Sequence, residues 1–184
     1  MTAKTVVLLH GWSVHHTDTY GGLPEQLARF GMGDGSALDL REIRLGRYIS
    51  FRDEVRMPDL VRALESAVRT ELADLITSSK RFVLITHSTG GPLAREWWTR
   101  YYARKGDDCP MSHLIMLAPA NFGSALAQLG KGKIGQLKAL ASSIEPGQGI
   151  LDWLELGSPE SWSLNESWIR RQFKPNSAAP VFRA

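Results

Sequence analysis

Three observations in the sequence predict an α/β fold built on a parallel sheet. Short apolar segments alternate with amphipathic ones, in the order strand, helix, strand, helix, strand, helix, strand, which is typical of parallel strands joined by crossover helices. Two of the expected strands are apolar throughout, as strands buried on both faces are. The 184 residues, 43% hydrophobic and 22% charged, fit one globular domain with a core of ordinary size.

The first part of the chain is expected to supply two strands and a short helix. Residues 5–10 form a β-branched and leucine-rich run that Gly11 closes, which predicts a buried strand. A helix is expected at 23–30, because Pro24 suits its first turn. Residues 37–45 alternate polar and apolar side chains and predict a second strand nearer the sheet edge.

The clearest helix begins near Pro58 and ends at Ser78. Its apolar face is formed by residues that recur at intervals of four and three: Leu60, Leu64, Val68, Leu72 and Leu75. A third strand, buried on both faces, is expected at 81–86, followed by a helix at 92–105 and a fourth strand at 113–118. These elements complete the sheet that the sequence predicts.

The character of the chain changes near residue 121, where glycines begin to separate short apolar pieces. No further buried strand is predicted, and three helices are expected: 134–142, 150–156 and 164–172. We therefore divide the chain into a core at 1–120 and a lid-like or C-terminal helical segment of the same domain at 121–184. The apolar residues of this segment would cover a pocket as a lid. Plain packing of helices against the sheet explains them equally well.

The most specific chemical signal is Ser88, at the turn between the third strand and the helix after it. A serine in a sharp strand-to-helix turn has its hydroxyl exposed above the sheet edge, and the start of the helix favours developing negative charge. We therefore predict Ser88 as a catalytic nucleophile and the Thr89 N–H as an oxyanion donor. His87 and Gly90 are predicted to support the turn.

The run Thr86-His-Ser-Thr-Gly-Gly91 departs from the G-x-S-x-G pattern at its first position. Thr86 stands in place of a glycine, so its side chain needs room beside the turn. The simpler alternative is a buried serine in an ordinary strand-to-helix turn. Nucleotide binding is a third reading, but the run has neither the lysine of a P-loop nor the spacing of a dinucleotide fingerprint.

Three segments look like the landmark segments of α/β-hydrolase lipases and esterases from bacteria: Val7-Leu-Leu-His-Gly-Trp12, Thr86-His-Ser-Thr-Gly-Gly91 and Leu117-Ala-Pro-Ala-Asn-Phe-Gly-Ser124. The resemblance covers residues 5–124 and implies a three-layer α/β-hydrolase fold that hydrolyses carboxylic esters through an acyl-enzyme on Ser88, without a cofactor. It also implies that the Trp12 N–H is a second oxyanion donor and that His10 shapes the turn. Ala120 stands where the family's P-H-x-G-S stretch has its histidine.

The base of a serine hydrolase is the missing part. In this fold the acid and then the histidine follow the serine in the chain, yet none of the five histidines comes after residue 113: His10, His15, His16, His87 and His113. Of these, His15 and His16 lie in a loop on the correct side of the sheet. The acids after Ser88 do not follow recognisable strands: Glu145, Asp152, Glu155 and Glu160.

These gaps leave two accounts of the chain. It is the N-terminal part of a longer hydrolase or a truncated product, so that the fold lacks its last strands, or it is a degenerate module that binds without turnover. The partner expected on either account is a small-molecule or lipid ester.

Composition excludes several other classes. The net charge of +3 is small and its basic residues are spread out, which does not favour nucleic acid. The single cysteine, Cys109, cannot form an intramolecular disulfide. The sequence has no signal peptide or membrane-spanning run, so we expect a cytoplasmic protein. The pair at 15 and 16 is weak support for metal binding, and no metal is expected.

Tryptophans are frequent, with six in the chain. Most of them follow Ser88, where a lipid-facing surface would lie in this fold, among them Trp97, Trp98, Trp153 and Trp162. Peripheral contact with lipid is one interpretation of them. Core packing is the other, and we favour it for the helical pair Trp97 and Trp98.

Overall fold

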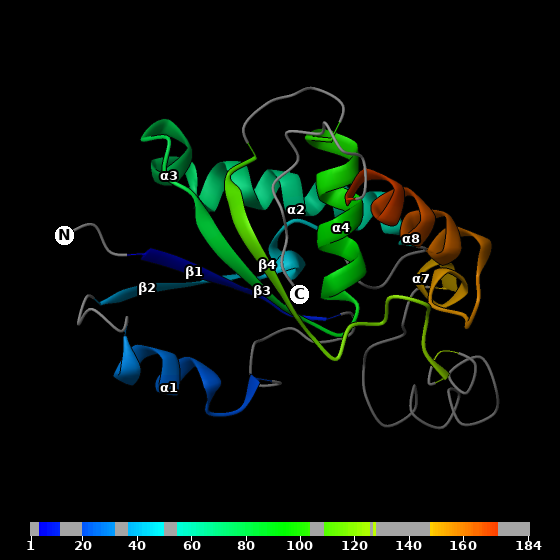
Figure 1. The fold of residues 1–184 in the computed structure, drawn as a ribbon, viewed down its shortest axis with the longest axis horizontal. Coiled ribbons are helices and arrows are strands. Elements are labelled where there is room, and N and C mark those ends of the chain that lie inside the picture. The colour runs from blue at the N-terminus through cyan, green and yellow to red at the C-terminus, as the bar shows by residue number, and fades with distance from the viewer. Residues whose placement is uncertain are drawn as a thin grey trace.

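A computed structural model of the chain describes residues 4–11, 20–31, 37–49, 55–103, 109–125, 127 and 148–172. A four-stranded sheet runs through them in the order β2-β1-β3-β4 (Figure 1). All three strand pairings are parallel, as predicted. The strands are β1 (Lys4–Leu9), β2 (Leu38–Ile43), β3 (Phe82–His87) and β4 (Met111–Leu117). The predicted end of β2 at residue 45 is wrong, because Leu45–Arg47 form a short 3-10 helix, η2.

Helices cover the two faces of this sheet and give three layers (Figure 1). On one face lies α1 (Leu23–Phe30), and on the other lie α2 (Met57–Glu71) and α4 (Gly90–Tyr101). Beyond α2 and α4, away from the sheet, are α7 (Gln148–Trp153) and α8 (Pro159–Gln172). The three-layer α/β architecture predicted from the sequence is therefore confirmed.

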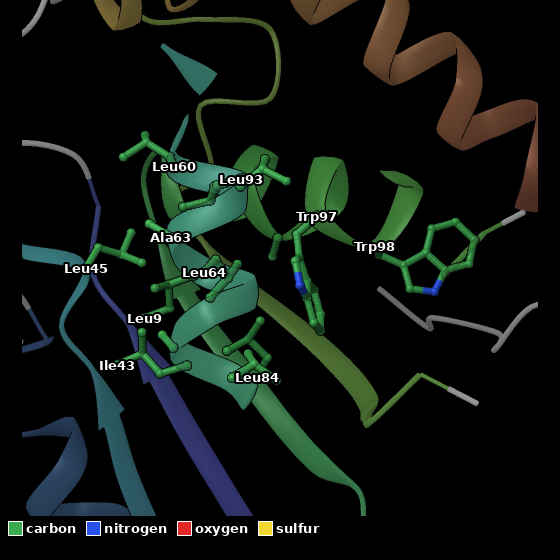
Figure 2. Close-up of a cluster of buried hydrophobic side chains, with 14 of the residues drawn as sticks. Leu9, Ile43, Leu45, Leu60, Ala63, Leu64, Leu84, Leu93, Trp97 and Trp98 are labelled. Carbon is green, nitrogen blue, oxygen red and sulfur yellow. The ribbon is translucent and has the colours of Figure 1, made fainter. Parts of the chain in front are cut away.

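The main core lies between the sheet and α2 and α4 (Figure 2). Leu9 and Ile43 reach it from the strands, and Leu64 reaches it from α2. A smaller cluster on the opposite face joins Val6 and Leu8 of β1 to α1. Successive residues of β1 are thus buried on opposite faces, which explains why its sequence is apolar throughout.

Trp97 and Trp98 of α4 are buried in the main core, with 0% and 3% of their surface exposed. Core packing was the favoured interpretation of this pair, and it is confirmed. Trp153 of α7 is also buried, at 8% exposure. Trp162, by contrast, is exposed, at 58%.

Two predicted helices have different bounds in the structure. The helix expected from Pro58 to Ser78 is broken at Leu72, and a separate short helix, α3 (Ala73–Thr77), follows it. The break accompanies a bidentate ion pair in which the Asp74 carboxylate accepts hydrogen bonds from Arg41 of β2 at 2.7 and 2.8 Å. The contact between Asp74 and the strand β2 is not visible in the helical spacing of the apolar residues, so the sequence did not predict the break.

The helix expected at 92–105 begins earlier, at Gly90, and ends at Tyr101. Its early start is possible because Pro92 lies in the first turn, where backbone N–H groups have no intrahelical acceptor and a missing one costs little. Residues 104 and 105 lie outside the described part of the chain.

The C-terminal helices also differ from their predicted ranges. The helix expected at 150–156 is α7, which ends at Trp153, and the one expected at 164–172 is α8, which begins at Pro159. Ser158 explains the early start of α8, because its hydroxyl oxygen accepts the Ser161 N–H at 3.2 Å and so caps the helix. The helix predicted at 134–142 lies outside the described residues.

The described part of segment 121–184 is packed on the rest of the chain. Ile150, Trp153 and Leu154 of the α7 region, and Leu164 of α8, belong to the same core as α2 and α4. Within the described residues, no helix is long and apolar enough to cross a membrane.

Candidate active site

Ser88 lies between the last residue of β3 and the first residue of α4, in a backbone conformation that serine rarely adopts. Its φ is +54°, in the left-handed region. A non-glycine residue there costs on the order of 1–3 kcal/mol, and such residues persist only where the surrounding structure holds them. The sharp turn that the sequence predicts at Ser88 is therefore present.

Hydrogen bonds to the segment after β4 hold the turn in place. The Ser88 N–H donates to the Leu117 carbonyl at 3.0 Å. The Ser88 carbonyl accepts from the Ala120 N–H and the Gly91 N–H, each at 3.2 Å. Since Leu117 ends β4 and Ala120 follows it, the ends of two neighbouring strands fix one another at this edge of the sheet.

Two glycines allow the close approach of backbone around Ser88. A Cβ added at Gly11 would lie 3.1 Å from the Ser88 Cβ and 3.6 Å from its Oγ. A Cβ at Gly90 would lie 3.1 Å from the Leu9 carbonyl oxygen. The chain leaving β1 therefore passes directly beside Ser88, and only small residues fit on either side.

Thr86 finds the room that its place in the pattern requires. Its side chain is buried, and its hydroxyl lies 3.5 Å from the Ile115 carbonyl oxygen of β4. A Cβ on Gly90 would approach the Thr86 Cβ to 3.3 Å. The glycine at position 90 thus leaves space for the threonine at position 86.

The structure describes one of the two predicted oxyanion donors, Thr89, and does not describe the other, Trp12. Thr89 is the N-cap residue of α4, so its N–H lies at the positive end of the helix dipole. Its amide donates to no backbone carbonyl among the described residues. Trp12 lies outside the described residues, although Gly11 immediately before it is placed beside Ser88.

His87 contacts a residue that sequence reasoning missed. Its Nδ1 is buried and has no hydrogen-bond partner within the described residues, and its ring meets the ring of Tyr20 edge-on, with centroids 6.1 Å apart. The Tyr20 hydroxyl lies 2.7 Å from the Leu9 carbonyl oxygen and 3.0 Å from that of Ile85. Burial raises the pKa of Tyr20, so the phenol remains a donor that bridges the ends of β1 and β3.

The other histidines that the structure describes are not placed as a base. His10 is buried with both ring nitrogens engaged, because Nδ1 donates to the Gly11 carbonyl at 2.8 Å and Nε2 accepts the Leu45 N–H at 3.2 Å. This geometry supports its predicted role in shaping the turn. His113 pairs in register with Val83, near the amino ends of the strands and away from Ser88. His15 and His16 lie outside the described residues.

Acids and metal ligands are equally sparse near Ser88. Asp152, Glu155 and Glu160 are exposed on α7, on α8 or between them, and none ends a strand. Glu145 lies outside the described residues. In the described ranges, no three residues of the metal-ligating types come close enough together to hold a metal ion.

A family model for alpha/beta hydrolases matches residues 6–183, nearly the whole chain. The chain belongs to the alpha/beta hydrolase family. No curated protein sequence matches it significantly. The expectation of an α/β-hydrolase fold, drawn from the resemblance of three segments, is confirmed.

Solved structures add two relatives. The chain is similar to phospholipase PlaB from Legionella pneumophila, with 51% identity and a TM-score of 0.76 over 91% of this chain and 36% of the phospholipase. A complex of the same phospholipase with thio-NAD matches with 49% identity and a TM-score of 0.72, over 91% and 34% of the two chains. The lipase BlEst2 from Bacillus licheniformis shares the fold, at 18% identity and a TM-score of 0.62, over 91% and 60%. The chain thus spans about a third of the solved phospholipase.

Proposed function

We propose that this chain is a serine hydrolase of carboxylic esters, with lipid esters as its substrate class and Ser88 as its nucleophile. One observation carries the proposal: Ser88 is held at a φ of +54° between β3 and α4, with Gly11 pressed against its side chain. A strained serine at a strand-to-helix turn, kept partly exposed at the sheet edge, is the arrangement that acyl transfer requires.

The reaction follows from this arrangement. The Ser88 Oγ attacks the ester carbonyl carbon and its proton passes to a base, which forms a tetrahedral oxyanion. The N–H groups of Thr89 and Trp12 are the proposed donors to that oxygen. The alcohol leaves with the proton, and water then hydrolyses the acyl-enzyme, which returns the serine and releases the acid.

The proposed substrate class rests on similarity to the solved phospholipase. The phospholipase at 51% identity acts on lipids by its name, and the chain shares 91% of its own length with that structure. A lipid substrate also accords with the exposed aromatic side chain of Trp162, which would contact lipid at the periphery. No metal or other cofactor is needed for this chemistry.

A second candidate function is binding without turnover. It is favoured by the placement of two of the described histidines. His10 has both ring nitrogens engaged, and His113 lies near the amino ends of the strands, away from Ser88. On this account the base is absent from the chain, and the turn at Ser88 serves only to hold an ester or acid.

Labelling with a fluorophosphonate probe tests the proposal, because the probe phosphonylates a serine whose hydroxyl is activated. If the 184-residue chain retains any activity, we expect labelling at Ser88, its loss in Ser88→Ala, and its retention in Ser163→Ala, which replaces an exposed serine of α8. Labelling that persists in Ser88→Ala would show that Ser88 is not the nucleophile. A folded chain that takes up no probe would favour the binding module.

A further inference from the structure

Three large apolar side chains are exposed on neighbouring segments, and we call them the aromatic patch after the two rings among them: Phe122, Leu156 and Trp162. They are 48%, 49% and 58% exposed. The rings of Phe122 and Trp162 meet edge-on with centroids 5.2 Å apart. Exposed apolar side chains that gather on one part of a surface are candidates for contact with a partner.

Backbone hydrogen bonds join the segments that carry the patch. The Gly157 N–H donates to the Phe122 carbonyl at 3.1 Å, and the Ser124 N–H donates to the Leu154 carbonyl at 2.7 Å. A Cβ at Gly157 would lie 3.4 Å from the Trp162 Nε1. The backbone segments beneath the three side chains are therefore joined to one another.

This surface is connected to Ser88 by a short stretch of chain. Phe122 follows the segment after β4 in which the Ala120 N–H donates to the Ser88 carbonyl at 3.2 Å. Figure 1 shows the chain leaving the carboxyl end of β4 and running toward α7 and the beginning of α8. The patch thus lies on the side of the molecule to which the carboxyl end of β4, and with it Ser88, is directed.

The charge of the segment that carries Leu156 and Trp162 bears on the kind of partner. Residues 148–172 carry four carboxylates, at 152, 155, 160 and 166, and only two arginines, at 170 and 171, although the whole chain is positive by three charges. The Arg170 guanidinium pairs with Glu166 at 2.6 Å, and Arg171 donates to the Ala103 carbonyl. An anionic surface is therefore not matched electrostatically, whereas tryptophan and phenylalanine suit the boundary between lipid headgroups and acyl chains.

We propose that the aromatic patch docks on an electrically neutral lipid–water interface and so presents lipid esters to the edge of the sheet where Ser88 lies. This inference rests on the proposed function for its purpose, but it concerns a separate surface. It commits to a zwitterionic or uncharged lipid surface, in place of a second copy of the chain or an anionic membrane.

Flotation with phosphatidylcholine vesicles tests the inference. We expect the wild-type chain to float with the vesicles, and Phe122→Ser/Trp162→Ser to bind about tenfold or more weakly, because two apolar side chains no longer enter the interface. The matched control is Ile115→Ser, which removes a side chain of similar exposure, 45%, from β4. It should bind like the wild type. Circular dichroism checks that each variant folds.

A second set of flotation measurements varies the lipid charge and the salt concentration. Binding should be insensitive to added sodium chloride and should not rise when phosphatidylserine replaces part of the phosphatidylcholine. Dependence on phosphatidylserine, equal binding by the double variant, or no binding by the folded wild type would overturn the inference. A wild type that dimerises through the patch without floating, while the double variant is monomeric, would assign the surface to a second copy.

The variant Ser88→Ala separates this inference from the proposed function. It should float as the wild type does, since the patch does not need the hydroxyl. Vesicle binding without any fluorophosphonate labelling would support the docking surface and refute the nucleophile. Labelling at Ser88 without vesicle binding would do the reverse.

Discussion

A Cβ placed on Gly11 would lie 3.1 Å from the Cβ of Ser88 and 3.1 Å from the His87 carbonyl oxygen. The carbonyl belongs to the backbone of β3, so it cannot turn aside as the end of a flexible side chain could. The space beside Ser88 is therefore open only because Gly11 has no side chain. This relationship links the end of β1 to the turn after β3.

The variant Gly11→Ala should consequently damage both stability and labelling. We expect a loss of about 1–3 kcal/mol in the free energy of unfolding, the usual cost of forcing extra carbon into a packed region, and slower fluorophosphonate labelling of Ser88. Urea denaturation and labelling time courses measure the two effects. Gly22→Ala is the control, because its added Cβ would meet no heavy atom within 4 Å. Unimpaired labelling in Gly11→Ala would contradict the close approach.

The strain at Ser88 predicts that removing its side chain entirely makes the protein more stable. Glycine adopts a φ of +54° without steric cost, so Ser88→Gly should raise the free energy of unfolding by about 1 kcal/mol. Ser88→Ala keeps the Cβ and should not gain as much. Thermal unfolding of the two variants under identical conditions gives the comparison. A melting temperature lower in Ser88→Gly than in Ser88→Ala would count against a strained turn.

Cys109 provides a pH-dependent prediction. It is 4% exposed, and burial raises the pKa of its thiol to about 12 in the folded chain, against 9.0 ordinarily. Because the folded pKa is raised, the thiol's contribution to stability is complete below pH 9 and is lost as the pH rises from about 9 to 12. Over that window the free energy of unfolding should fall by up to about 1.4 kcal/mol per pH unit.

Two measurements check the behaviour of Cys109. Unfolding curves between pH 8 and 11 should show a shallower decline for Cys109→Ala than for the wild type. A thiol reagent at pH 8 should modify Cys109 only in denaturant. Rapid modification of the native chain would mean that the thiol is accessible and its pKa is not raised.

The core elements could be predicted because their residues satisfy local and tertiary demands at once. The strand β1 is apolar on both faces, and α2 places Leu60 and Leu64 toward the sheet, so periodicity and burial agree. The start of α8 was missed because its inner face is polar: Ser161 and Asn165 are buried there.

A polar contact explains that inner face. The Arg95 guanidinium of α4 donates to the Asn165 Oδ1 at 2.8 Å and lies over the Trp168 ring, 5.0 Å from its centroid. Burial lowers the pKa of Arg95 to about 10. Because these buried positions are polar, the hydrophobic repeat of α8 does not extend to its first residues, and the sequence predicted the helix only from residue 164.

Some residues of the candidate site could likewise be predicted from the sequence, and others could not. Ser88 and Gly90 were accessible to prediction because a buried strand, a turn and a helix follow one another in the chain. Tyr20 was not, because its hydroxyl bridges Leu9 and Ile85, which are far from it in sequence. The only local sign of Tyr20 is an aromatic residue ahead of the glycine pair that precedes α1.

The last prediction concerns turnover by the 184-residue chain. The turn at Ser88 is present and Thr89 is the N-cap residue of α4, yet His10 and His113, as the structure describes them, are not placed to serve as a base. Without the base, an oxyanion hole and binding still give roughly 10³–10⁴-fold acceleration over water, which is small beside the roughly 10⁶-fold or more of a complete enzyme. We therefore expect weak or undetectable hydrolysis of p-nitrophenyl butyrate. If His15 or His16 supplies the base, hydrolysis should instead be fast and should collapse when that histidine is replaced by alanine. Fast hydrolysis by His15→Ala/His16→Ala would show that the base lies elsewhere in the chain, with His87 the next residue to replace, since its Nδ1 has no partner within the described residues.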